Sequence, residues 1–448
     1  MIRRRFLSLS LLFLLLLPFP ALAALKAGAA RTVITPQTSI WMAGYAFRNK
    51  PSEGKLHDLY ARALALEDDQ GTKAVFLASD IIGIPAGLAA RVSARVEKEC
   101  GVPRANLMLT CSHTHSGPAL RDNLKDMYGM PEEEWQKVIQ YMKWLEDKMV
   151  EVIQESVRDL KPAKISRGVG TASFTINRRQ YNLDSISIGL NPIGPVDEDA
   201  PVLKVIDEKG AIKAVVFGYA CHNTTLSGYE INGDYAGFAQ LDLEEAIPGA
   251  VAMFFIGCGA DQNPNPRRKI EDAQNHGREL AEAVRQVLSG AMKEVDGPIH
   301  AAFSLTDLSL IPAPTREQLQ EQLKDSNIHI QRRAKNLLST LDEKGKIPET
   351  YPYPLQVWRL NDFLIVAMGG EVVVDYSLRL KHELGRENAW IVGYANDVCC
   401  YIPSLRVLKE GGYESVDSMI YYGFHGPWAP PIEETIVKEV HRLVDAAK

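Results

Sequence analysis

The stretch LMLTCSHTHSGP, Leu107–Pro118, carries the strongest fold signal in the sequence. Its apolar first half predicts a buried strand, and its second half supplies two imidazoles, His113 and His115. Side chains two residues apart share one face of a strand, so both rings point into one cavity if the strand continues through them. Gly117 and Pro118 are turn residues that end it. Two convergent imidazoles suit a metal site or an acid–base pair, and a polar strand end is the structural alternative.

Strands and helices alternate along the rest of the chain. Apolar runs predict strands at 28–35, 61–67, 74–79, 105–111, 164–171, 202–206, 214–220, 250–257, 299–306, 357–358, 363–368 and 390–394. Amphipathic patterns predict helices at 85–99, 131–158, 235–246, 271–291, 374–385 and 431–447. This order predicts an α/β domain with layered, mixed β-sheets covered by helices. The charged segment 314–345 is expected to be a solvated helix or helical hairpin, inserted into the domain.

Two more reactive groups follow predicted strands. His222 comes directly after the apolar run 214–220, and Glu371 follows the run 363–368 through two glycines. Ligands of layered α/β domains bind outside the carboxyl ends of strands. Two histidines and a carboxylate with one open coordination position make a hydrolytic zinc site. The structural alternatives are a hydrogen-bonded core histidine at His222 and a carboxylate that stabilises a helix N-terminus at Glu371.

The N-terminus reads as a targeting segment. Arg3–Arg5 precede an apolar run, and Ala21–Ala23 form a small-residue cleavage signal. We therefore expect a signal peptide over residues 1–23, export to the periplasm or medium, and a mature domain over 24–448, with a retained anchor as the alternative. The net charge of −6 excludes a strongly basic nucleic-acid-binding protein.

The six cysteines do not form a recognisable disulfide framework. Cys111 and Cys221 lie inside apolar strand patterns, where a small buried hydrophobe is the simpler interpretation. No C-x-x-C pair occurs, which argues against a cysteine-rich structural zinc site.

Over about residues 28–430 the sequence resembles the neutral, non-lysosomal ceramidases, zinc amidases that cleave the N-acyl bond of ceramide. The most specific match is SHTHSGP at 112–118. Supporting matches, in the same order as in the family, are GKL with the following histidine at 54–57, NR at 177–178, GPVD at 194–197, the His222 and Glu371 segments, the tyrosine-bearing segment 401–413, and YG and GP at 422–427.

The resemblance implies roles for six residues. It implies that zinc is held by His113, His222, Glu371 and Tyr401. It also implies that His115 and Arg178 line the reaction centre. A tyrosine is an unusual zinc ligand, so Tyr394 is kept as an alternative to Tyr401, which could instead be an ordinary core tyrosine.

The sequence departs from the family in two places. The loop after the strand 250–257 reads GADQNP at 259–264, where the family has a GDVSPN-like sequence with a serine. The β-sandwich domain that follows the catalytic domain in full ceramidases is expected to be missing. That domain shapes the substrate cleft, so the expected substrate is ceramide or a related N-acyl lipid or small amide, met in transient contact with a membrane surface.

Two other functions remain open at this point. One is a metallo-hydrolase of another substrate class, although the H-x-H-x-D-H continuation of binuclear enzymes is absent because 116–118 read SGP. The other is a non-catalytic, cell-envelope binding module on a ceramidase-like fold. The retained ligand set argues against such a module, and the altered 259–264 loop argues for it.

Overall fold

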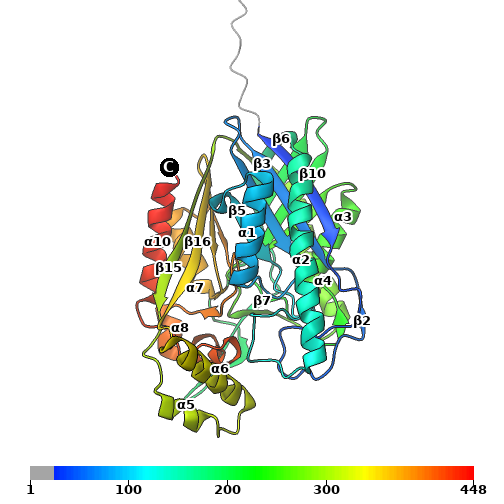
Figure 1. Cartoon of the computed structure of the whole chain (residues 1–448). Coiled ribbons are helices and arrows are strands. Elements are labelled where there is room, and N and C mark those ends of the chain that lie inside the picture. The colour runs from blue at the N-terminus through cyan, green and yellow to red at the C-terminus, as the bar shows by residue number, and fades with distance from the viewer. Residues whose placement is uncertain (1–24) are drawn as a thin grey trace, which may run out of the picture.

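Two β-sheets pack face to face, and helices cover their outer faces, in a computed structural model that describes residues 25–448 (Figure 1). The predicted signal peptide at 1–23 lies outside the described residues. The predicted α/β class, with mixed sheets covered by helices, is confirmed. Nowhere in 25–448 is a helix apolar and long enough to traverse a bilayer.

The larger sheet has the strand order β12-β10-β9-β6-β1-β3-β4-β5, with β14 paired to β6. Its strands are β1 Lys26–Val33, β3 Tyr60–Glu67, β4 Lys73–Ser79, β5 Leu107–Cys111, β6 Lys161–Thr171, β9 Asp199–Asp207, β10 Ile212–Tyr219, β12 Val251–Ile256 and β14 Lys293–Val295. Pairing is antiparallel except between β4 and β5 and between β10 and β12. The sheet curls, so that β12 contacts β3, β4 and β5.

The second sheet has the order β15-β16-β17-β19. Its strands are β15 Ile299–Ser309, β16 Thr350–Leu360, β17 Phe363–Met368 and β19 Ala389–Val392. Three small sheets lie among the loops. They are formed by β2 Gly54–Lys55 with β11 Glu230–Ile231, by β7 Thr175–Tyr181 with β8 Ile186–Asn191 and β13 Gln262–Pro264, and by β18 Glu371–Val372 with β20 Tyr401–Ile402.

Helices α2, α3 and α4 lie against the larger sheet, α1 packs on α2, and α7 and α10 contact the second sheet. The helices are α1 Ala86–Cys100, α2 Glu132–Arg158, α3 Asp234–Ala246, α4 Ile270–Ser289, α5 Arg316–Gln322, α6 Ile328–Lys344, α7 Val374–Leu384, α8 Leu405–Glu410, α9 Met419–Tyr422 and α10 Ile432–Ala446, with shorter helical turns at Arg104–Asn106 and Tyr413–Asp417. Figure 1 shows α1 and α2 on one side of the molecule and α10 beside β15 and β16.

The apolar patterns explain these layers. In α2, Val138, Leu145 and Val152 are fully buried, and their seven-residue spacing places them on one helix face, toward β1 and β3. Between the sheets, the Phe76 ring lies 4.5 Å from Trp358 and 5.3 Å from Phe255. This inter-sheet core excludes water and keeps the strands in fixed relation to each other.

The sequence prediction differs from the structure at the central motif. Strand β4, helix α1 and strand β5 form the expected strand–helix–strand unit, in which the two strands are parallel. However, β5 ends at Cys111, and His113 adopts a left-handed backbone conformation with φ 59°. The strand therefore does not continue through the two histidines, and a turn rather than a shared strand face brings their rings together.

Helices α5 and α6 form the helical pair expected in the 314–345 segment. Helix α6 packs on the loop that precedes α2: His329 Nδ1 lies 3.1 Å from the Asp126 carbonyl oxygen, and Arg332 donates to the Met127 carbonyl at 3.2 Å. The His329 ring also lies 5.0 Å from Tyr421. The pair is thus tied to two loops rather than projecting freely into solvent.

All six cysteines lie in the described part of the chain, and none of them forms a disulfide there. Cys111 and Cys221 are fully buried, as expected for small apolar residues. The fold is therefore held by packing and polar contacts rather than by covalent cross-links.

One buried ion cluster ties α7 to the 194–199 loop. The Lys381 ammonium lies 2.6 Å from Asp197 Oδ2 and 2.9 Å from Asp199 Oδ2, and Ser377 donates to Asp197 at 2.5 Å. Lys381 is 7% exposed and Asp197 is 5% exposed, so water screens this pair little.

We expect Lys381→Met to lower the free energy of unfolding by about 3 to 5 kcal/mol, because it leaves the buried Asp197 carboxylate without its cation. Urea unfolding followed by circular dichroism measures the change. The matched control is Arg285→Met, which removes an exposed pair with Glu282 and should leave the unfolding midpoint nearly unchanged. Equal midpoints for the two variants would contradict the assigned role of the buried cluster.

Candidate metal centre and reaction cavity

Three strand ends bring the predicted ligands together. His113 and His115 follow β5, His222 follows β10, and Glu371 follows β17 at the start of β18. Tyr401 is placed by the next pairing, because β20 runs parallel to β18 with Tyr401 opposite Glu371. Backbone and side-chain contacts between the two histidine segments hold them together, since the His115 N–H donates to the Asn223 carbonyl at 3.2 Å.

The imidazoles and the carboxylate meet at their tips. Glu371 Oε2 lies 3.3 Å from His113 Nε2 and 3.1 Å from His222 Nε2. His115 Nε2 lies 3.1 Å from His113 Nε2. One nitrogen from each of the three histidines falls within 4.8 Å of the others, a spacing that a single metal ion could bridge. His115 thus lies close enough to be a ligand, although the resemblance assigns it another role.

Hydrogen bonds on the far side of two rings orient these tips. His113 Nδ1 lies 2.5 Å from the Ile82 carbonyl oxygen, and His222 Nδ1 lies 2.8 Å from the Gly259 carbonyl oxygen. A carbonyl oxygen only accepts, so both Nδ1 atoms carry the proton and both Nε2 atoms of the neutral rings present lone pairs. Burial, followed by the charge of Arg178, lowers the pKa of His222 to about 4, which keeps that ring neutral.

The residues present fit a metal ion. Among residues 25–448, Glu371 Oε2 has no hydrogen-bond donor although it is buried, and it faces the two unprotonated Nε2 atoms. A buried anion surrounded by lone pairs is unfavourable without a cation. The nitrogen and oxygen donors are those that zinc prefers.

Two tyrosines lie near His222 on opposite sides of its ring. Tyr401 Oη is 3.3 Å from Nε2, the metal-facing nitrogen, whereas Tyr394 Oη is 3.4 Å from Nδ1, which already faces a carbonyl. The geometry therefore favours Tyr401 over Tyr394 as an additional ligand. Tyr422, whose segment belongs to the resemblance, donates from its hydroxyl to Glu371 Oε1 and orients the carboxylate.

Glu371 does not stabilise the N-terminus of α7, which was the structural alternative. That place is taken by Asp261, whose Oδ1 accepts from the Val374 N–H at 2.8 Å. Asp261 also accepts from Asn177 Nδ2 at 3.1 Å, and its carbonyl accepts from the Arg178 N–H at 2.8 Å. The altered 259–264 loop therefore connects α7 to the strand that carries Arg178.

Arg178 is fixed by three partners beside the candidate metal-binding cluster, which consists of His113, His222 and Glu371. Its guanidinium donates to Glu414 at 2.8 Å, to Tyr401 Oη at 3.0 Å and to Asn263 Oδ1 at 3.3 Å. Burial opposes its charge, but Tyr401 and Glu414 raise the pKa of Arg178 well above its usual value. Glu414 also pairs with Arg179 at 2.7 Å, so one buried carboxylate holds two neighbouring arginines.

The His115 ring is held between Gly44 and the other histidines. A Cβ on Gly44, whose φ is 90°, would lie 2.4 Å from His115 Nδ1, so only glycine allows this close approach. The Tyr45 ring lies 5.0 Å away on the same side. Burial, followed by the nearby His113 and His222 rings, holds the pKa of His115 well below its usual value.

A cavity of about 210 Å³ opens onto this centre. His115, Arg178 and Tyr401 line it, whereas Glu371 lies behind them. Sequence reasoning did not single out Glu414, Asn263 or Arg267. Glu414 directly follows the tyrosine-bearing segment 401–413, and Asn263 lies in the altered loop 259–264. Both residues therefore lie in or next to segments that the sequence analysis had named.

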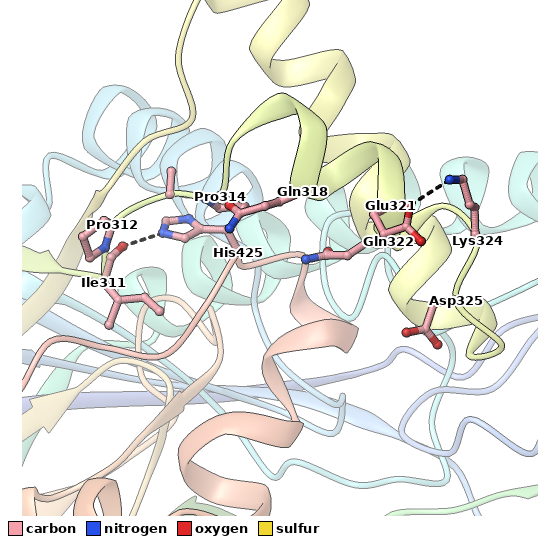
Figure 2. A pocket seen from close by; sticks show the side chains of 10 residues that line it. Ile311, Pro312, Pro314, Gln318, Glu321, Gln322, Lys324, Asp325 and His425 are labelled. Carbon is pink, nitrogen blue, oxygen red and sulfur yellow. Dashed lines mark hydrogen bonds and ion pairs between the residues drawn. The ribbon is translucent and has the colours of Figure 1, made fainter.

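A larger hollow lies elsewhere on the surface. It is a groove of about 730 Å³ between the 311–314 segment and α5. Figure 2 shows two pairs of polar groups in it: Lys324 Nζ lies 2.7 Å from Glu321, and His425 Nε2 lies 2.8 Å from the Ile311 carbonyl oxygen. None of the predicted metal ligands lines this groove.

Comparison with known proteins gives the same family as the sequence motifs. Residues 26–267 match the family described as neutral/alkaline non-lysosomal ceramidase, N-terminal. The neutral ceramidase of Pseudomonas aeruginosa is 26% identical over 331 residues, which cover 67% of this chain and 48% of that protein. Neutral ceramidase A of Dictyostelium discoideum is 26% identical over 50% of this chain and 34% of its own length. The chain thus matches half or less of the length of these relatives.

Solved structures show the same fold. A crystal structure of neutral ceramidase from Pseudomonas aeruginosa and a structure titled as a ceramidase complexed with C2 each superpose with a TM-score of 0.71 at 19% identity. The superpositions cover 95% of this chain and 74% and 75% of those chains, respectively. With the family match extending over more than half of its sequence, the chain belongs to the neutral/alkaline non-lysosomal ceramidase family.

Proposed function

We propose that this protein is an exported, zinc-dependent amidase that hydrolyses the N-acyl bond of ceramide or a related N-acyl lipid. The observation that carries the proposal is the buried Glu371 carboxylate, whose Oε2 lies 3.1 to 3.3 Å from two imidazole nitrogens and lacks a donor in the described chain. The targeting segment predicted from the sequence at residues 1–23 supports export. Membership of the ceramidase family supports amide hydrolysis.

His113, His222, Glu371 and Tyr401 are the residues that would hold zinc. The chemistry that zinc supplies in such a site is Lewis-acid activation of water and of the acyl carbonyl. The near-complete burial of the four side chains supports this assignment, because low solvent access strengthens the electrostatic contribution of the site.

Arg178 is placed to bind the substrate carbonyl. Three bonds hold its guanidinium against Glu414, Asn263 and Tyr401, and its other N–H donors remain for a bound substrate. A fixed cation stabilises the negative charge that develops on the carbonyl oxygen during acyl transfer. Because Arg178 is already oriented, little reorganisation is needed when the substrate arrives.

His115 is placed to carry the proton. Its Nδ1 has no hydrogen-bond partner among residues 25–448, and its ring lines the cavity beside the metal-binding cluster. A neutral imidazole can accept a proton from the attacking water and return it to the leaving nitrogen. Gly44 and Tyr45 restrict the ring on the side away from the cluster and support this geometry.

We expect His222→Ala and Glu371→Gln to lower zinc affinity by on the order of a hundredfold or more, because even outer-shell changes cost ten- to a hundredfold. Zinc content after dialysis against a weak chelator, measured by atomic emission, tests this. Glu208→Gln, at an exposed turn, is the control for loss of one carboxylate. Native zinc content in both site variants would rule out the assigned ligands.

The reaction itself is tested by a substrate screen. Purified protein would be offered ceramides, N-acyl amino acids and small amides, with and without chelator, and free amine would be measured. Chelator-sensitive release of amine is expected. Zinc binding without turnover of any of these N-acyl compounds would contradict the enzymatic proposal and favour a binding module.

We expect His115→Ala and Arg178→Ala to retain zinc and lower kcat by on the order of a hundredfold to a thousandfold, the cost of one oxyanion donor in other hydrolases. Glu414 keeps Arg179 as a partner in Arg178→Ala, so that variant should fold. Arg285→Ala, at an exposed helix position, should keep the wild-type rate. Loss of zinc in His115→Ala would show instead that His115 is a ligand.

A further inference from the structure

The walls of the reaction cavity are chemically divided. Ile188, Met127 and Tyr421 contribute apolar surface. Arg178 and Arg267 contribute positive charge. Carboxylates are absent from the cavity lining within the described chain. A neutral substrate needs no such excess of positive charge, so the charge points to a feature of the ligand.

The two arginines differ in how their charge is balanced. The Arg178 charge is neutralised by Glu414, which lies 2.8 Å away and is buried. Arg267 has no ion pair or hydrogen bond to its guanidinium within residues 25–448, and the charges of Arg268 and Arg178 act on it. Asp234, a carboxylate whose charge also acts on Arg267, already accepts backbone N–H groups. Arg267 is therefore a partly buried cation that lacks a counter-ion.

The backbone around Arg267 is held in place. The Arg268 N–H donates to the Thr225 carbonyl at 2.8 Å, and the Asn265 N–H donates to the Phe174 carbonyl at 2.8 Å. These bonds anchor the chain on both sides of Arg267 and join it to β13, which carries Asn263. The guanidinium thus belongs to the wall of the cavity and not to a free surface loop.

We propose that the cavity selects N-acyl amines whose amine portion carries a carboxylate, namely N-acyl amino acids, and that Arg267 binds this carboxylate. The inference rests on the proposed amidase function and names its substrate class. In an N-acyl amino acid one carbon separates the amide nitrogen from the carboxylate. A substrate whose carbonyl lies at Arg178 therefore carries its anion within the same small cavity.

The cavity dimensions agree with this assignment. A space of about 210 Å³ accommodates the reacting amide and a compact head group but not a long acyl chain as well. The acyl chain would leave along the apolar side, where Ile188 of β8 lines the cavity and is itself 50% exposed. Leu190 on the same strand is 57% exposed and continues that apolar surface.

The reaction is a balanced hydrolysis. Water adds its oxygen to the acyl carbon, the carbon–nitrogen bond breaks, and the leaving nitrogen takes up a proton. The products are a fatty carboxylate and a free amino acid in its zwitterionic form. No oxidant, reductant or second substrate is required.

The test compares N-lauroylglycine with N-lauroylglycinamide, which differ only by replacement of the carboxylate with a neutral amide. For the zinc-loaded full chain we expect kcat/KM to be roughly ten- to a hundredfold higher for N-lauroylglycine, as for one charge-assisted hydrogen-bonding pair. Arg267→Gln should reduce this ratio at least tenfold, mainly by raising KM for N-lauroylglycine. Equal kcat/KM values for the two substrates in the wild type would overturn the proposal.

Arg268→Gln is the matched control. It removes the same charge from the next residue, whose exposed side chain does not line the cavity. It should leave the substrate ratio unchanged. If Arg267→Gln and Arg268→Gln reduce the ratio equally, the effect comes from general surface charge, and Arg267 is not the carboxylate-binding residue.

A binding measurement separates this inference from the proposed catalytic function. Calorimetric titration of the zinc-free protein with N-lauroylglycine should show binding that weakens at least tenfold in Arg267→Gln and not in Arg268→Gln. This result would support the anion subsite even if no amide were hydrolysed. Equal affinity of the wild type for N-lauroylglycine and N-lauroylglycinamide would overturn the subsite even if ceramide were hydrolysed.

Discussion

The candidate site is organised around one electrostatic feature, the buried Glu371 carboxylate, whose burial favours a cation beside it. Its Oε2 faces His113 Nε2 and His222 Nε2, and backbone carbonyls hold the protons of both rings on their far sides. Glu371 Oε2 itself has no hydrogen-bond donor in the described chain. The strand ends that deliver them come from both sheets, so the inter-sheet core also determines the geometry of the site.

A second constraint acts around the first. Glu414 accepts hydrogen bonds from both Arg178 and Arg179. Asp261 links the 259–264 loop to α7, and the Tyr422 hydroxyl orients Glu371. Each contact links segments that are far apart in the sequence. The altered 259–264 loop thus remains part of the framework of the site even though it lacks the serine of the family sequence.

Much of the fold follows from local patterns, because buried strands and amphipathic helices have distinct periodicities. The runs at β4, β5, β10 and β17 predict both the strands and the residues that follow them. The sequence patterns did not predict the antiparallel pairings, such as that of β1 with β3, because strand order depends on contacts between distant segments. The left-handed conformation of His113 was also not predictable, since non-glycine residues rarely adopt it without tertiary support. Glu414 and Arg267 acquire their importance only from neighbours that folding brings to them.

The attachment of α6 has a consequence for the shape of the cavity. Side chains of the helix contact the Asp126 and Met127 carbonyls, and its His329 ring meets Tyr421 edge to face, while Met127 and Tyr421 line the cavity. Substitutions in the outer helical pair can therefore change the shape of the wall and leave His113, His222 and Glu371 untouched.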